Sequence, residues 1–156
     1  MAKLILMRHG TAKNIPDPPL SEIGLTEVHM ASDKVSKWDV THFFSSPSRR
    51  CVSTAKVLSR AKAEIKTDAR LDDGSSWEKV RPLIDEIKRI DGTAVVVTHA
   101  PVIKSVLVQL LGIPPEKIDL SKISPLSYSV IELDGSAPFA DKLLTDMFYE
   151  SSKIFT

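Results

Sequence analysis

Two histidines stand just beyond two strongly apolar short runs of the chain. His9 comes two residues after Leu4–Met7, and His99 comes two residues after Val95–Val97. Uncharged runs of this length are typical of strands that are buried on both faces of a parallel sheet. Ligands of open α/β sheets bind beyond the carboxyl ends of such strands, so we expect the two imidazoles to meet at one site.

The residues next to these histidines are suited to bind an oxyanion. Arg8 offers a planar donor fork that is always charged, and Gly10 lets a substrate approach the backbone closely. Pro101 is expected to open a helix directly after His99, and a helix N-terminus carries free N–H groups and partial positive charge. The anion that these features fit is a phosphoryl group.

A further arginine is expected from another helix N-terminus. Pro47 is predicted to occupy the first helical position there, which places Arg49 and Arg50 in the first turn. Adjacent helical residues point about 100° apart, so at most one of the two arginines can face the site. An arginine in that place would strengthen an anion site.

His9 is the candidate nucleophile. An imidazole nitrogen attacks phosphorus only when the ring is neutral, and nearby arginines disfavour the protonated form. Phosphoryl transfer requires mainly positioning and charge stabilisation, which this set of residues supplies. His29 in a helix and His42 in a strand have no comparable setting, and we interpret both as structural.

The elements that position these residues alternate along the chain. Strands are expected at residues 3–7, 40–44, 63–67, 93–98 and 127–133. Helix starts, each marked by a capping residue or a proline, are expected at Ser21, Pro47, Ser75 and Pro101. The third helix has the capping-box pattern Ser75–Glu78 and is expected to end at Gly92. This alternation predicts a single three-layer α/β domain over residues 1–156, with a mostly parallel central sheet and helices on both faces.

The composition excludes several classes of function. The 156 residues include 21 Lys or Arg and 20 Asp or Glu, so the formal net charge is +1 and no overall field attracts nucleic acid or membrane. The single Cys51 excludes an intramolecular disulfide. The N-terminal apolar run is too short for a signal peptide or a membrane span. We therefore expect a cytoplasmic protein without nucleic-acid or membrane partners; the sequence does not indicate its oligomeric state.

Four sequence blocks resemble, in order, those of the histidine phosphatase superfamily, also called the phosphoglycerate mutase-like family. They are Leu6–Gly10, Pro19–Gly24, Ser45–Ala55 and Val96–Ala100. Many members have two glycines after the second histidine, whereas Ala100 and Pro101 here are similar to the small phosphohistidine phosphatases of the SixA type. The resemblance implies the phosphoglycerate mutase-like α/β fold.

The resemblance also implies a role for each matched residue. His9 would carry a phosphohistidine intermediate, and the residues that would bind the transferring phosphoryl group are Arg8, Arg50 and His99. The family's arginine stands four residues before the threonine of its Thr-Ala pair, which selects Arg50 over Arg49. The residues expected to contact the substrate are Gly10, Asn14 and Ala100. No metal and no organic cofactor is implied.

The chain departs from the family at the acid that protonates the leaving group. Many members carry a glutamate after the third strand, whereas this sequence has Asp72 and Asp73 before Gly74. Asp73 is nearest to the expected position, and it is either a shorter proton donor or a turn residue. Glu78 is explained by its capping box.

The spacing after this acid favours hydrolysis over mutase activity. Sugar-phosphate mutases of the family carry a long insertion that caps the site, whereas only the twenty residues 74–93 separate the acid from the second histidine strand. An uncapped site does not exclude water from a phosphorylated intermediate. We therefore expect a phosphatase that acts on phosphohistidine proteins or on small phosphomonoesters.

Three alternatives stay open. A phosphoglycerate mutase or a small sugar-phosphate phosphatase would use Asp73 as a true general acid. A non-catalytic phosphate-binding module would use the arginines and the helix N-terminus without needing His9. A metal site built on His9, His99 and Asp73 is disfavoured, because the two flanking arginines would repel a cation.

Overall fold

The computed structural model describes residues 1–134 and 137–148, so the predicted end of the domain at residue 156 lies outside the described residues. Its strands are β1 (Ala2–Arg8), β2 (His42–Ser45), β3 (Ile65–Thr67), β4 (Gly92–Thr98), β5 (Tyr128–Glu132) and β6 (Phe139–Thr145). Its α-helices are α1 (Glu22–Val35), α2 (Arg49–Leu58), α3 (Trp77–Ile87) and α4 (Ala100–Leu111). Short 3₁₀ helices lie at Ala69–Leu71, Pro115–Lys117 and Leu120–Lys122.

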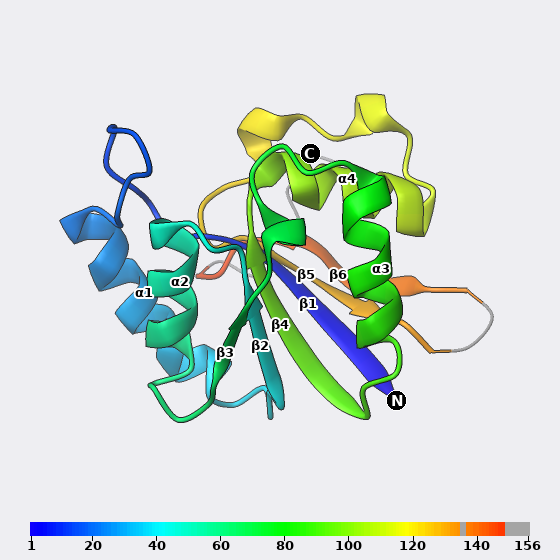
Figure 1. The fold of residues 1–156 in the computed structure, drawn as a ribbon, viewed down its shortest axis with the longest axis horizontal. Helices are drawn as coiled ribbons and strands as arrows, with labels where there is room; N and C mark the ends of the chain where they lie inside the picture. Colours follow the sequence, from blue (N-terminus) through cyan, green and yellow to red (C-terminus); the bar gives the residue numbers. More distant parts are fainter. Residues whose placement is uncertain (135–136, 149–156) are drawn as a thin grey trace.

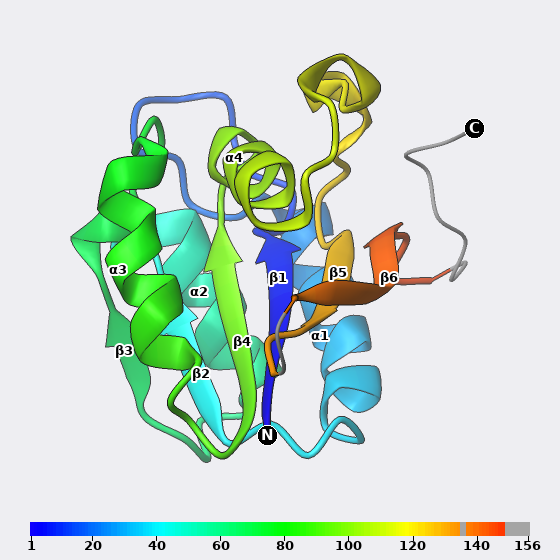
Figure 2. The same cartoon turned by 90° about the vertical axis from the view of Figure 1, so that its right-hand side faces the viewer.

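The strands of the described residues form a six-stranded sheet in the order β3-β2-β4-β1-β5-β6. β3, β2, β4 and β1 run parallel, whereas β5 is antiparallel to β1, and β6 is antiparallel to β5. Helices α1 and α2 cover one face of the sheet, and α3 and α4 cover the other (Figures 1 and 2). The predicted three-layer α/β fold with a mostly parallel sheet is therefore confirmed; β6 lies in a C-terminal region for which no strand is predicted.

Each face of the sheet has its own core, because successive residues of a strand point to opposite faces. In β1, Leu4 and Leu6 belong to the cluster built with α3 and α4, whereas Ile5 and Met7 belong to the cluster built with α1 and α2. These four side chains are all buried. The continuous apolar run at the start of the chain is thus a strand covered on both sides, as predicted.

The paired strands β1 and β4 end side by side. Arg8 pairs with Thr98 in parallel register, and the His9 N–H donates to the Thr98 carbonyl over 3.1 Å. His9 and His99 therefore follow two neighbouring strand ends. This adjacency confirms the expectation that the two imidazoles meet.

The predicted starts of α1 and α4 are correct. The hydroxyl of Ser21 accepts a hydrogen bond from the Gly24 N–H over 3.0 Å and caps α1. α4 begins directly after His99, which is its N-cap residue. It ends at Gly112, whose φ of 72° lies in the left-handed region that glycine adopts without strain.

The prediction that Pro47 occupies the first helical position of α2 is wrong. Ser48 is the N-cap residue, and the first backbone hydrogen bond of the helix runs from the Val52 N–H to the Ser48 carbonyl. The Ser46 carbonyl instead accepts from the Ser45 hydroxyl over 2.7 Å. The proline therefore precedes the cap, and the two arginines still lie in the first turn.

The predicted capping box Ser75–Glu78 is also wrong. The N-cap residue of α3 is Ser76, and its side chain makes no capping hydrogen bond. The Ser75 N–H instead donates to the Asp72 carbonyl over 3.0 Å and closes a turn before the helix. α3 also ends before Gly92, which opens β4 rather than stopping the helix.

Candidate active site

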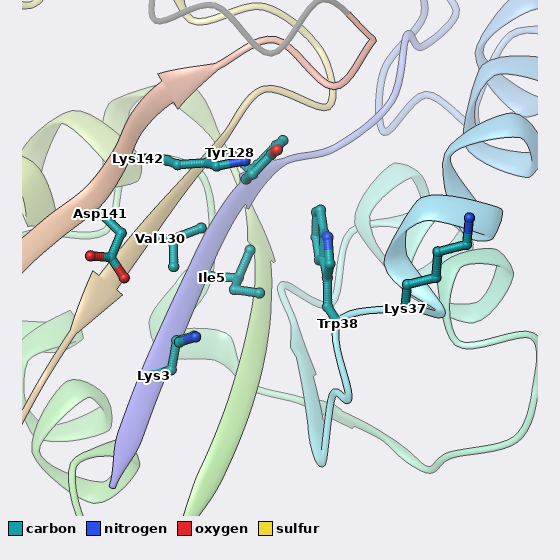
Figure 3. Close-up of a pocket in the computed structure, with 8 residues that line it drawn as sticks. All are labelled: Lys3, Ile5, Lys37, Trp38, Tyr128, Val130, Asp141 and Lys142. Atoms are coloured by element: carbon teal, nitrogen blue, oxygen red, sulfur yellow. The ribbon is translucent and has the colours of Figure 1, made fainter.

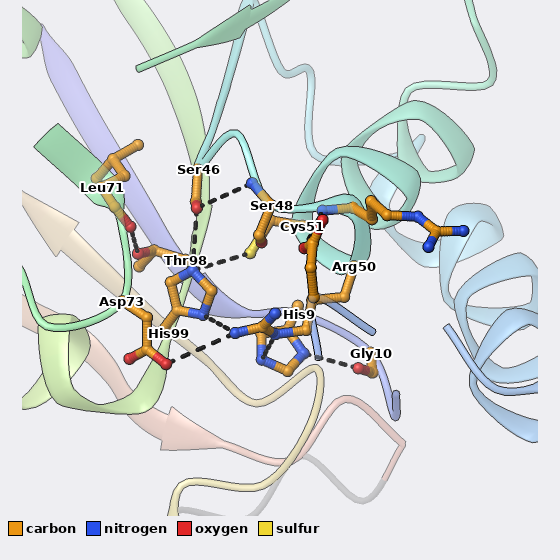
Figure 4. A network of polar contacts seen from close by, with 12 residues as sticks. His9, Gly10, Ser46, Ser48, Arg50, Cys51, Leu71, Asp73, Thr98 and His99 are labelled. Carbon is orange, nitrogen blue, oxygen red and sulfur yellow. Dashed lines mark hydrogen bonds and ion pairs between the residues drawn. The ribbon is translucent and has the colours of Figure 1, made fainter. Parts of the chain in front are cut away.

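The carboxyl ends of β1 and β4 open into a pocket of about 370 Å³. The residues that line it are Arg8, His9, Gly10, Thr11, Ala12, Pro18, Arg50, Asp73, His99 and Pro125. All five residues predicted to be catalytic are in this set. Figure 4 shows the side chains of His9, His99, Arg50 and Asp73 converging there.

His9 is held as one tautomer of the neutral imidazole. Its ring is buried, with Nδ1 at 2.8 Å from the Gly10 carbonyl oxygen and Nε2 at 3.2 Å from Nε of Arg50. A guanidinium can only donate hydrogen bonds, so Nε2 accepts and carries a lone pair. The proton therefore resides on Nδ1, which donates to the Gly10 carbonyl. Nε2 is the nitrogen that is ready to attack.

Burial keeps this ring neutral. It is the main reason that the pKa of His9 falls from 6.5 to about 4. The hydrogen bond to Gly10 opposes this shift, and the charges of Arg8 and Arg50 add to it. The lone pair of Nε2 is therefore available throughout the neutral pH range.

His99 is held as the opposite tautomer. Its Nδ1 lies 3.1 Å from an NH2 group of Arg50 and must accept from it, so the proton resides on Nε2. Nε2 donates to the Ser46 hydroxyl oxygen over 2.9 Å, and Sγ of Cys51 lies 3.6 Å away. Burial and the charge of Arg50 lower the pKa of His99 to about 4. The two imidazoles meet edge to face, with ring centroids 5.4 Å apart, His9 against His99.

Arg50 connects the two histidines. Its Nε reaches His9, and its Nη2 reaches both His99 and the carboxylate of Asp73, the latter at 3.6 Å. Arg49 is exposed and does not line the pocket. The structure thus places Arg50 rather than its neighbour in the candidate site.

Arg8 is anchored at the other side of the site. Its Nη1 donates to the Ile123 carbonyl over 2.6 Å, whereas its buried Nε has no hydrogen-bond partner among the described residues. Burial and the charge of Arg50 lower the pKa of Arg8 from its usual value, but a guanidinium remains charged. An anion in the pocket would supply a partner for this unpaired donor.

Asp73 lies at the mouth of the pocket. Its side chain is 56% exposed and forms the ion pair with Arg50. It follows the 3₁₀ helix Ala69–Leu71, which is fixed to the core because the Thr98 hydroxyl donates to the Leu71 carbonyl over 2.7 Å. The carboxylate is thus within reach of a leaving group, but it is more open to water than the histidines are.

The three residues predicted to contact the substrate lie in different surroundings. Gly10 lines the pocket, but a Cβ at this position would stand 2.7 Å from Cγ2 of Val28, so packing against α1 also requires glycine. Asn14 is exposed and is not among the residues that line the pocket. Ala100 packs against the core and does not line the pocket either.

The loop of residues 11–20 forms part of the rim and closes on itself. The Thr11 carbonyl accepts from both the N–H and the hydroxyl of Ser21, over 2.9 and 3.2 Å. The Lys13 N–H donates to the Pro19 carbonyl over 3.0 Å. Pro18 reaches the pocket from this loop, while Asn14 stands out in solvent.

Three residues make contacts in the site that were not predicted from the sequence. The Thr54 hydroxyl accepts from the Gly10 N–H over 3.1 Å and donates to the Arg50 carbonyl over 2.7 Å. Its place four residues after Arg50, on the same helix face, could have indicated a shared role. Ser46, which accepts from Nε2 of His99, and the carbonyl of Ile123, which accepts from Arg8, carry no comparable sequence signal, because each lies far along the chain from its partner.

Residues 1–134 and 137–148 contain neither a candidate metal-binding cluster nor a candidate membrane-spanning helix. No group of three or more His, Cys, Asp or Glu side chains in this part is arranged to hold a metal ion. No helix in it is long and apolar enough to cross a membrane.

The sequence model of the histidine phosphatase superfamily (branch 1) matches residues 4–82 and 74–145 of this chain. The chain belongs to this superfamily. Over 69 residues it is 35% identical to the probable phosphoglycerate mutase GpmB of Yersinia pestis, and the match covers 39% of this chain and 32% of that protein. The matched part is thus about a third of the length of these relatives.

Solved structures of the superfamily share the fold. A phosphoserine phosphatase variant of Entamoeba histolytica, in complex with phosphoserine, superposes with a TM-score of 0.76 at 18% identity and covers 91% of this chain and 96% of its own. The mycobacterial glucosyl-3-phosphoglycerate phosphatase superposes with a TM-score of 0.78 at 19% identity, and the match covers 94% of this chain and 99% of that chain. SixA of Agrobacterium tumefaciens superposes with a TM-score of 0.70 at 20% identity, and the match covers 84% of this chain and 91% of that chain. At these identities the likeness shows the fold alone.

Proposed function

We propose that this chain is a phosphatase that transfers a phosphoryl group from its substrate to Nε2 of His9 and then to water. One observation carries the proposal: Nε2 of a buried, neutral His9 bears its lone pair in a pocket that also holds Arg8 and Arg50. A phosphate-binding module would need the arginines but not a histidine held in this tautomer.

In the first step, the Nε2 lone pair forms a bond to phosphorus while the bond from phosphorus to the leaving group breaks. Arg8 and Arg50 donate to the phosphoryl oxygens, and Arg50 gives up its hydrogen bond to His9 as the phosphorus approaches. The leaving group takes a proton from Asp73 or from water. In the second step, a water oxygen attacks phosphorus and gives one proton to the group that protonated the leaving group, Asp73 or solvent. The P–N bond breaks, its electron pair returns to Nε2, and inorganic phosphate is released.

His99 takes part through a change in protonation. In the empty site its Nδ1 accepts from Arg50, so it offers a lone pair rather than a proton to the pocket. The negative charge of a bound phosphoryl group favours protonation of this ring. The protonated ring then donates from Nδ1 to a phosphoryl oxygen while Nε2 keeps its bond to Ser46.

We propose phosphohistidine-bearing proteins as the preferred substrates and small phosphomonoesters as weaker ones. An imidazole leaving group needs less help from an acid than an alkoxide does, and Asp73 is a short side chain that is paired with Arg50 and 56% exposed. Between Asp73 and β4, α3 is the only helix, so this stretch contains no insertion that would cap the pocket against a protein surface. The fold is shared with SixA of Agrobacterium tumefaciens.

A trapped phosphoenzyme tests the nucleophile. The wild-type protein is mixed with a phosphohistidine protein that carries a radioactive phosphoryl group and is quenched in alkali, in which phosphohistidine survives. We expect label on the wild-type chain and none on His9→Ala, with turnover lost in that variant. Full activity of His9→Ala would refute His9 as the nucleophile, whereas phosphate binding without turnover and without any labelled chain would favour the binding-module alternative.

The role of Asp73 as the proton donor is tested by comparing Asp73→Asn with Asp72→Asn. Asp72 is the neighbouring carboxylate and does not line the pocket. Asp73→Asn should lower kcat for p-nitrophenyl phosphate less than for an alkyl phosphate, and it should leave kcat for phosphohistidine protein nearly unchanged. Asp72→Asn should behave as wild type on all three substrates. Equal loss on phosphohistidine and alkyl phosphate would contradict the proposed substrate preference.

A phosphoglycerate mutase is the second candidate, because the sequence match to the probable mutase GpmB favours it. A mutase would interconvert 3-phosphoglycerate and 2-phosphoglycerate faster than it releases inorganic phosphate. Measuring both products with the wild-type protein separates the two activities.

A further inference from the structure

A second pocket lies on the face of the sheet that α1 and α2 cover. It has a volume of about 350 Å³, within the range of small-molecule sites, and shares no lining residue with the candidate active site. Strands β1, β5 and β6 form one wall, and the residues that follow α1 form the other (Figure 3). The residues that line it are Lys3, Ile5, Lys37, Trp38, Tyr128, Val130, Asp141 and Lys142.

The interior of this pocket is aromatic and aliphatic. The rings of Trp38 and Tyr128 contact each other, with centroids 4.8 Å apart and planes tilted by 46°. Ile5 and Val130 line the pocket from the sheet. Trp38 stands opposite the strands in Figure 3 and is only partly buried although it packs on the core. It therefore leaves indole surface on which a planar ring can stack.

The rim of the pocket is mainly basic. Lys3, Lys37 and Lys142 line it, against the single carboxylate of Asp141. Lys3 forms an ion pair with Glu132 at 3.7 Å. Lys37 and Lys142 have no ion-pair partner among the described residues. Their charges are therefore available to an anion.

Tyr128 adds an unpaired polar group to this pocket. Its hydroxyl is buried and has no hydrogen-bond partner among the described residues. Lys142 lies 5.9 Å from the centre of its ring. Buried hydroxyl groups in folded proteins are normally hydrogen-bonded, so this hydroxyl is an unpaired polar group in the wall of the pocket.

We propose that this pocket binds a small planar aromatic anion of the nucleoside monophosphate class, at a site separate from the catalytic one. The ring would stack on Trp38, and the phosphate would be held by Lys142 beside Tyr128, with Lys37 adding positive potential from the other side of Trp38 (Figure 3). Both parts of such a ligand contribute to binding: the planar ring stacks on the indole of Trp38, and the negatively charged phosphate attracts the lysines. The inference does not depend on the proposed phosphatase activity.

Tryptophan fluorescence provides a direct test. The chain contains two tryptophans, so Trp77→Phe leaves Trp38 as the only one. This variant is saturated with vanadate to fill the catalytic pocket and is then titrated with AMP, with adenosine and with inorganic phosphate. We expect saturable quenching by AMP and weaker binding of the other two. Absence of quenching by AMP, or its abolition by vanadate, would overturn the proposal.

Lysine variants in the same background locate the site. Lys37→Ala and Lys142→Ala should each weaken AMP binding by about two- to fivefold, as expected for exposed charges. Lys79→Ala, an exposed lysine of α3 on the other face of the sheet, is the matched control and should bind as the background protein does. Unchanged binding in both pocket variants would refute the site even if quenching occurs.

Discussion

Acid should destabilise this protein in part by protonating its two buried histidines. His9 is 6% exposed and His99 is 2% exposed, and burial lowers the pKa of each from 6.5 to about 4 in the folded state. Below the unfolded-state value of 6.5, the unfolded chain binds more protons at these rings than the folded chain does. The free energy of unfolding therefore falls as the pH falls from 6.5 towards 4. Above pH 6.5 both rings are neutral in the folded and unfolded chains and do not change it.

The size of the effect follows from the two pKa values. At pH 5 a histidine is almost fully protonated in the unfolded chain and almost fully neutral in the folded one. Lowering the pH from 7 to 5 therefore costs about 2 kcal/mol of unfolding free energy for one such histidine. The ring centroids of His9 and His99 are 5.4 Å apart, so the two contributions are coupled and single variants are the appropriate perturbation.

The assay is urea unfolding at pH 7 and at pH 5 for the wild type and for His9→Asn. Asparagine does not titrate, so the variant should lose about 2 kcal/mol less than the wild type between the two pH values. His42→Asn is the matched control, because His42 is exposed. An equal loss of stability in wild type and His9→Asn would refute the claim that His9 is held neutral by burial.

Three further substitutions test individual contacts. Arg50→Lys should lower kcat/KM on p-nitrophenyl phosphate by about a hundredfold, because an ammonium cannot supply the guanidinium's separate donors to the site; a loss of only a fewfold would contradict this role. Ser46→Ala should cost about 1–3 kcal/mol in urea unfolding, because it leaves the Nε2–H of His99 buried without its oxygen partner. Gly24→Ala should cost about 3 kcal/mol or more, since its Cβ would stand 2.0 Å from the Thr11 carbonyl oxygen; thermal unfolding measures this, and wild-type stability would refute it.

Signals that act within a few residues were readable in the sequence. The apolar runs predict β1 and β4, and Ser21 predicts the start of α1. The rule that ligands bind at the carboxyl ends of parallel strands was enough to bring His9 and His99 together. These inferences needed no knowledge of distant contacts.

The mispredicted helix starts share a physical cause. At each one, a neighbouring group captures the hydrogen bond that the sequence pattern assigns to the helix. The Ser45 hydroxyl occupies the Ser46 carbonyl before α2, and the Asp72 carbonyl engages the Ser75 N–H before α3. Which of two local partners wins depends on how the segment packs, and that information is not local.

The finer design of the site also depends on long-range contacts. The tautomer of His99 is fixed by Arg50, whose guanidinium can only donate to Nδ1, and the position of Arg8 is fixed by a backbone carbonyl at Ile123, 115 residues away in the chain. A backbone carbonyl has no residue type by which a sequence could reveal it. Residue types therefore located the chemistry, whereas the fold decided which nitrogen of each histidine carries the proton.

The loop of residues 11–20, whose ends are hydrogen-bonded to each other, can vary in length and sequence. Its ends are joined by the hydrogen bonds of Ser21 to Thr11 and of Lys13 to Pro19, and Asp17 accepts a further hydrogen bond from the Arg49 N–H of α2. Doubling the length of such a loop costs only about 0.6 kcal/mol of closure entropy. Since Pro18 reaches the pocket, insertions at 14–16 would change the rim beside His9 while the hydrogen bonds that join the ends of the loop stay in place.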